Sequence, residues 1–95
     1  MRERFFGLYR GQVVGNLDPM HGGRLRVLVP DVFGEDEQMW AMPCSPYADP
    51  RAGFQLPSDG ANVWVAFEGG DPDAPIWVGC FWAYGLVPPE AVQPP

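Results

Sequence analysis

Glycine and proline interrupt this chain so often that they limit what it can fold into. Each occurs 12 times in 95 residues, and no stretch between them carries the apolar stripe of a stable helix. Hydrophobic residues nevertheless make up 46% of the chain and include four tryptophans, which opposes a disordered state. The sequence therefore predicts one small all-β domain of short strands joined by tight turns.

Apolar residues occupy every second position in three segments, as expected for strands with one buried face. These segments are 24–29, 62–68 and 76–81, and further strands are predicted at 8–16 and 39–42, with 54–56 pairing at an edge. Short strands in so small a chain favour a closed five-stranded barrel, because closure removes unpaired sheet edges. The side chains expected inside the barrel are Leu25, Val27, Val29, Val63, Val65, Phe67, Ile76, Val78 and Cys80.

Turn residues separate the predicted strands. Asp18-Pro19 and Gly22-Gly23 mark a sharp turn after the first strand, and the stretch 69–75 indicates a hairpin with an irregular loop between the last two. Proline recurs from residue 87 onward, which prevents a further strand and indicates an extended chain. We therefore divide the sequence into a barrel domain at residues 1–86 and a proline-rich C-terminal tail at residues 87–95.

The last two strands have more apolar surface than one small barrel can enclose. If alternate residues face inward as above, their aromatic side chains lie together on the outer face and need a cover. The segment 35–56 folds over this face, or another protein does, since aromatic residues dominate protein interfaces. The residues predicted to form a protein interface are Trp64, Trp77, Phe81 and Trp82, with Trp40, Tyr47 and Phe54 as second choices.

The charge of the chain disfavours two classes of partner. Its net charge is -6, and its six basic residues are scattered arginines, whereas nucleic-acid binding and membrane-surface binding both depend on clustered basic residues. No apolar run is long enough for a membrane-spanning helix, and the first residues do not resemble a signal peptide. We therefore expect no nucleic-acid partner, no stable membrane insertion, synthesis in the cytoplasm and reduced Cys44 and Cys80.

No group of residues has the composition of a reaction centre. Ser45 has His21 as its one candidate base and lacks the surrounding sequence of a nucleophile elbow. His21, Cys44 and Cys80 do not have metal-ligand spacing, and the acidic residues between 31 and 37 are typical of a solvated run. We therefore predict that the protein is not an enzyme and has no catalytic, cofactor-binding or metal-binding residues.

An ordered set of sequence blocks resembles the phage baseplate assembly protein V family. This family is the OB (oligonucleotide/oligosaccharide-binding) domain at the base of the tail spike in contractile phages, in type VI secretion (Vgr-type) spikes and in extracellular injection systems. The resemblance extends from Phe6 to Trp82 and implies an OB-type barrel, with an SH3-like barrel as the structural alternative. The blocks are Tyr9 to Val14, Asn16 to Pro19, Gly23 to Pro30, Trp40 to Ala48, Gly53-Phe54 and Leu56 to Gly79.

The resemblance also implies a function without catalysis. It implies a structural component of a contractile phage tail baseplate or related injection system, located in the virion tail after synthesis in the host bacterium. A homotrimer on the tail axis would contact a baseplate hub protein on one side and a spike or needle protein on the other. Many relatives continue into a lysozyme domain or a β-helical needle. Because the sequence stops at Pro95, we expect an adaptor whose tail docks a separately encoded spike or hub.

Two alternatives remain open at this point. One is an OB-fold module that binds nucleic acid or carbohydrate, for which salt-sensitive binding of single-stranded DNA would be the signature. The other is an enzyme such as a peptidoglycan hydrolase, which would need a paired acid and nucleophile in one cleft.

Overall fold

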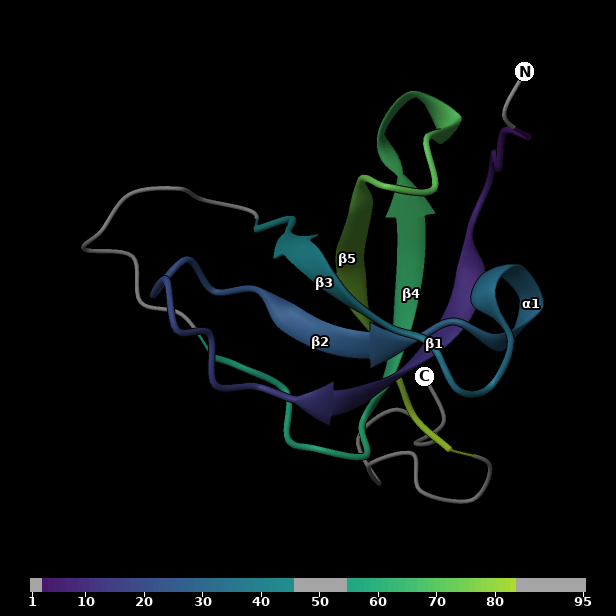
Figure 1. Cartoon of the computed structure of the whole chain (residues 1–95). Coiled ribbons are helices and arrows are strands. Elements are labelled where there is room, and N and C mark those ends of the chain that lie inside the picture. Colours follow the sequence, from purple (N-terminus) through teal and green to yellow (C-terminus); the bar gives the residue numbers. More distant parts are fainter. Residues whose placement is uncertain (1–2, 46–54, 84–95) are drawn as a thin grey trace, which may run out of the picture.

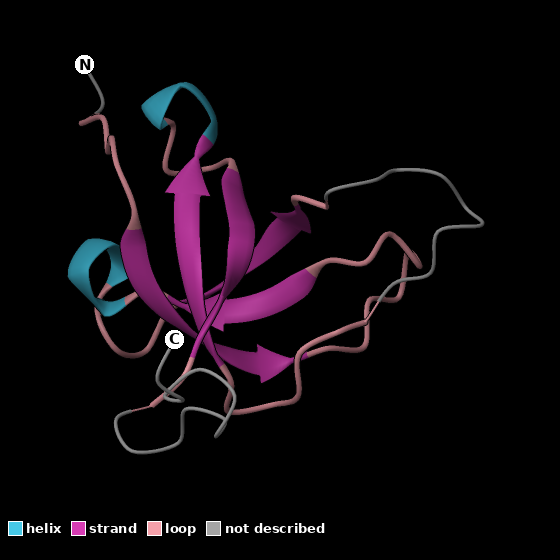
Figure 2. Ribbon diagram, turned by 180° about the vertical axis from the view of Figure 1, so that it is seen from behind, coloured by secondary structure: helices cyan, strands magenta, loops and turns pink. Residues whose placement is uncertain are grey.

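The computed structural model describes residues 3–45 and 55–83 of the chain (Figure 1). Within these residues five strands form a closed barrel in the order β1-β2-β3-β5-β4, and two short helices lie outside its wall (Figure 2). The predicted all-β, five-stranded closed barrel is therefore confirmed. The elements are β1 (Tyr9–Gly15), β2 (Leu25–Leu28), α1 (Pro30–Phe33), β3 (Gln38–Pro43), β4 (Asn62–Phe67), η1 (Glu68–Gly70) and β5 (Pro75–Phe81).

Four of the five strand contacts around the barrel are antiparallel. These contacts join β1 to β2 and β4, β2 to β3, and β4 to β5. The barrel closes where β3 runs parallel to β5 over only two residue pairs, Met42 with Ile76 and Pro43 with Trp77. The Cys44 backbone N–H extends this seam by donating to the carbonyl oxygen of Trp77 at 3.1 Å.

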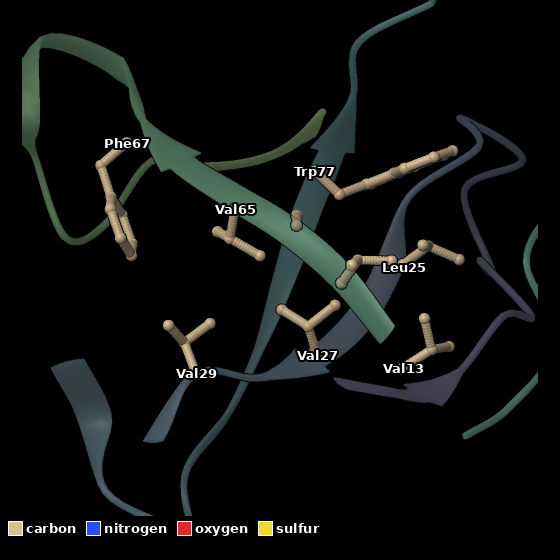
Figure 3. Packing of buried hydrophobic residues seen from close by; sticks show 9 residues of the cluster. Val13, Leu25, Val27, Val29, Val65, Phe67 and Trp77 are labelled. Carbon is tan, nitrogen blue, oxygen red and sulfur yellow. The ribbon is translucent and has the colours of Figure 1, made fainter. Parts of the chain in front are cut away.

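The core is built mainly from the inward faces of β2 and β4, with one side chain of the buried cluster each from β1, β3 and β5 (Figure 3). Strand β2 and the residue after it bury Leu25, Val27 and Val29, as predicted, and β4 buries its predicted set as well. Each apolar side chain of this size stabilises the fold by about 1.5–3 kcal/mol when it is fully removed from water. The complete buried cluster is Val13, Leu25, Val27, Val29, Ala41, Val63, Val65, Phe67 and Trp77.

The face predicted for β5 is wrong. Trp77 lies in the core with 6% of its surface exposed (Figure 3), whereas Cys80 is exposed and Ile76 and Val78 are only half-buried. Residues directly opposite each other in an antiparallel pair share a face. Because the buried Val65 pairs with Trp77, the tryptophan must point inward too.

An irregularity in β5 explains how it reverses its alternation. Val65 pairs with Trp77 while its neighbour Trp64 pairs with Gly79, so Val78 is an extra residue in β5. Gly79 adopts a φ of +148°, which side chains other than glycine rarely accept. The strand thus contains a bulge, which places Phe81 on the outer face as predicted.

The short helix α1 follows β2, in a segment for which the sequence predicts no helix. The first backbone N–H groups of a helix have no partner within the helix, so the proline at the start of α1 loses no hydrogen bond. Its fixed φ is also compatible with a helix. The Phe33 ring packs against the Phe67 ring with centroids 5.8 Å apart. Gly34 then ends the helix with a φ of +79°. Within residues 3–45 and 55–83, no helix has the length and hydrophobicity to cross a membrane.

Candidate protein interface

The outer side of β1, β4 and β5 carries a cluster of one cation and two aromatic rings, which we call the Arg10 face. Arg10 and Trp64 are direct partners across the β1–β4 pair. The ring centroids of Trp64 and Phe81 lie 4.6 Å apart at an interplanar angle of 40°. The Arg10 Cζ atom lies 5.1 Å from the Trp64 centroid and 4.9 Å from the Phe81 centroid, so one guanidinium lies within cation–π distance of both rings.

The bulge in β5 makes this cluster possible. Gly79 is the residue directly opposite Trp64, and it presents no side chain on the outer face. Phe81 is therefore the diagonal neighbour of Trp64, and long aromatic side chains reach across that distance. The next residue, Trp82, is 60% exposed and follows the end of the strand.

Arg10 is the one charge on this side of the barrel among the described residues of the three strands. The other outward residues are polar, apolar or glycine, and Arg10 forms no ion pair with any described residue. The face is therefore largely uncharged with a single unpaired cation. The outward set, taken from the strand pairing, is Arg10, Gln12, Asn62, Trp64, Ala66, Ile76, Gly79 and Phe81.

A second arginine–tryptophan cluster begins in the loop between β1 and β2. The Asp18 carboxylate accepts hydrogen bonds from the backbone N–H groups of Met20 at 2.9 Å, Gly22 at 2.8 Å and Arg24 at 3.2 Å. It also pairs with the Arg24 guanidinium, with Nη2 2.9 Å and Nε 3.1 Å from its oxygens. The Arg24 side chain holds the pKa of Asp18 well below its usual range; burial opposes this effect and the backbone donors reinforce it.

Arg24 and Arg26 both lie over the ring of Trp40, with Cζ-to-centroid distances of 4.8 Å and 5.8 Å. Arg26 is the direct partner of Trp40 across the β2–β3 pair. Trp40 and Arg26 line an open groove of about 920 Å³, which we call the Trp40 groove. Leu17, which is 86% exposed, and Asp59 also line it.

The structure unites some of the predicted interface residues and separates others. The rings of Trp64 and Phe81 pack together on the Arg10 face, the exposed Trp82 follows Phe81 in the sequence, and Trp40 lies on a different surface. Trp77 does not belong to a surface: it is buried, and its ring N–H donates to the Gly23 carbonyl oxygen at 3.3 Å. Tyr47 and Phe54 lie outside the described residues.

Sequence reasoning missed the arginines that complete both clusters. The alternation in 24–29 shows that Arg24 and Arg26 point outward, but their aromatic partner depends on the register of β2 against β3. The same holds for Arg10, whose partner depends on the register of β1 against β4. Asp18 in an Asp-Pro turn signals a local hydrogen-bonded turn, but its ion pair with Arg24 has no sequence signature.

The remaining candidates for chemistry are dispersed. His21 is exposed on its loop with a φ of 55°, and Cys44 and Cys80 are free, exposed thiols. The expectation that Cys80 fills the core is therefore wrong, for the same reason as the rest of the β5 set. In the part of the chain that the structure describes, no three His, Cys, Asp or Glu residues are grouped so that they could hold a metal ion.

A model of a known protein family matches most of this chain. A search of curated proteins found none that matches this chain. A family model described as the type VI secretion system/phage-baseplate injector OB domain matches residues 9–82. The match begins in β1 and ends just after β5, so it covers the whole barrel and the Arg10 face. The chain therefore belongs to the type VI secretion system/phage-baseplate injector OB domain family.

Proposed function

We propose that this protein is a non-enzymatic adaptor in the hub and spike complex of a contractile phage tail or related injection system. It assembles as a homotrimer on the tail axis of the virion baseplate, between a hub protein and a separately encoded spike or needle protein. Family membership supports the coarser part of this proposal, a structural role in a baseplate or injector.

The Arg10 face is the observation that carries the proposal of assembly. Trp, Tyr and Arg are the residues most enriched at interface hot spots, and here Arg10, Trp64 and Phe81 lie in contact on one outer face. Trp82 leaves 60% of its surface in water beside them, although burying such a ring is strongly favourable. A partner that covers this face would remove that exposed aromatic area.

A closed barrel is suited to a structural subunit that must keep its shape under mechanical force. Its wall is hydrogen-bonded around the circumference, and its interior is a close-packed cluster of apolar side chains. A subunit of this kind transmits force through its backbone and matches its neighbours by symmetry, so no reacting group is needed.

Native mass spectrometry of the purified protein tests the proposal, alone and mixed with the products of neighbouring genes. We expect a species with three times the 10.5 kDa chain mass. Trp82→Ala should raise the dissociation constant of this species by about tenfold or more, as for a hot-spot aromatic residue. Leu17→Ala is the matched control, because Leu17 is even more exposed but lies on the Trp40 groove.

Two results of this experiment would contradict the proposal. A single-chain mass under all conditions, with and without the neighbouring products, excludes an assembling adaptor. Equal weakening by Trp82→Ala and Leu17→Ala excludes the Arg10 face as the specific contact.

A second candidate function rests on the Trp40 groove. Arg26 and Trp40 in one groove are the residue types with which OB folds bind oligonucleotides. Asp18 and Asp59 line the same groove, however, and the chain has a net charge of -6. A salt-sensitive mobility shift with single-stranded DNA would support this function, and the absence of a shift at low salt would reject it.

A further inference from the structure

The guanidinium of Arg10 lies against two aromatic rings, with its Cζ atom 5.1 Å from the Trp64 centroid and 4.9 Å from the Phe81 centroid. Its N–H donors can pair with both oxygens of a carboxylate. Arg10 makes no ion pair with any described residue. Two rings therefore hold a cation that has no carboxylate partner among the described residues.

The charge of the surroundings identifies the kind of partner. No acidic side chain lies among the outward residues of the Arg10 face, in a chain whose net charge is -6. The connection from α1 to β3 has the opposite character: Glu35, Asp36 and Glu37 are consecutive and exposed, and they form no ion pair within the described residues. Among its described residues the chain thus presents a cation without an ion pair on β1 and an acidic run without ion pairs between α1 and β3.

We infer that the Arg10 face of one subunit binds the acidic run 35–37 of a second copy of this chain. The inference rests on the proposed homotrimer and names the contact that holds it together. The acidic run leads into β3, which pairs with β2 and β5, whereas Arg10 lies on β1 beside β4. Two different surfaces therefore meet at each contact, and such head-to-tail contacts close into a ring when the rotation between subunits allows it.

Charge reversal with rescue tests the contact. Arg10→Glu alone and Glu35→Arg with Glu37→Arg should each raise the dissociation constant of the homo-oligomer by about tenfold or more, because like charges then face each other. The variant that combines all three substitutions should recover assembly to within about threefold of the original protein, because every contact regains opposite charges. Native mass spectrometry over a dilution series measures all four proteins.

Arg26→Glu is the matched control. Arg26 is also an arginine over a tryptophan without an ion pair, but it lies at the Trp40 groove, so its reversal should leave the dissociation constant within about twofold. Far-ultraviolet circular dichroism checks that each variant is folded. If Arg10→Glu fails to fold, the variant with Glu35→Arg and Glu37→Arg still tests the contact. It changes only exposed side chains in the connection between α1 and β3.

The outcomes separate this inference from the proposed function. If the original protein forms a trimer and neither the single reversals nor the control weakens it, the inference is overturned and the adaptor function stands. If the reversals weaken the trimer but the combined variant is not rescued, the pairing is also overturned. If the original protein remains a single chain under all conditions, the proposed function fails first.

Discussion

The Arg10 face and the Trp40 groove are built from the same residue types but differ in what holds the arginine. Beside the groove, Arg24 lies over the Trp40 ring and is fixed by the Asp18 carboxylate, which also accepts three backbone hydrogen bonds. On the face, Arg10 is held by the rings of Trp64 and Phe81 and has no ion pair with any described residue. Arg24 therefore contributes to the stability of its loop, whereas Arg10 has no carboxylate partner in the part of the chain that the structure describes.

This difference shows that packing against a tryptophan ring does not by itself define the role of an arginine. In both places the ring contact holds the guanidinium, and at exposed sites such a contact contributes little to stability. The role of the arginine depends on whether a carboxylate of the same chain also pairs with its guanidinium. The predictions below test that distinction on each side, beginning with the largest expected effect.

Trp77→Ala should lower the free energy of unfolding by about 3–5 kcal/mol, as expected when a buried aromatic side chain leaves a cavity. The substitution also removes the hydrogen bond to Gly23, which lies beside Arg24 at the groove. Urea unfolding followed by fluorescence measures the loss. Trp82→Ala, at a 60% exposed position, should change the same free energy by less than about 0.5 kcal/mol, and equal losses would contradict the core position of Trp77.

Asp18→Asn should destabilise the protein at neutral pH and remove part of its acid sensitivity. The pKa of Asp18 is depressed in the folded protein, so its carboxylate stabilises the fold fully above the ordinary aspartate pKa of about 3.9. This contribution is lost as the pH falls from there through the depressed folded pKa. The difference in the free energy of unfolding between the two proteins should therefore narrow between about pH 4 and pH 2; a constant difference from pH 7 to pH 2 would contradict the ion pair.

Arg10→Met should have only a small effect on stability, about 0.5–1 kcal/mol, because it removes an exposed cation–π contact and keeps the apolar stem. Since Arg10 has no carboxylate partner among the described residues, the acid dependence of unfolding should match that of the original protein. A changed acid dependence would show that the face, like the groove, contains an internal ion pair.

The sequence predicted the barrel and two of its faces because alternation decides them. In β2 and β4 one set of alternate residues is uniformly apolar, so Leu25 and Val63 could be placed inside without knowing the register. In β5 apolar residues occupy both sets, and alternation cannot choose between them. Gly79 was the available sign of a bulge, and only pairing with β4 shows that Trp77 faces inward.

The candidate interface could be predicted only in part for a similar reason. Trp64 and Phe81 were assigned to one outer face, and they stack there. Their partner Arg10 is more than fifty residues away in sequence, and its position follows from the β1–β4 register, which no local pattern specifies. Long-range pairs of this kind depend on how strands align, so composition and spacing leave them open.

The shortest strand pairing in the barrel lies between the Trp40 groove and the Arg10 face. Trp40 is on β3 and Phe81 is on β5, and these two strands meet over only two residue pairs. The sheet closes into a barrel at this short overlap of β3 and β5. Sliding β3 past β5 breaks fewer backbone hydrogen bonds than sliding any other two neighbouring strands. The β3–β5 pairing is therefore the part of the barrel wall whose alignment is held by the fewest residue pairs.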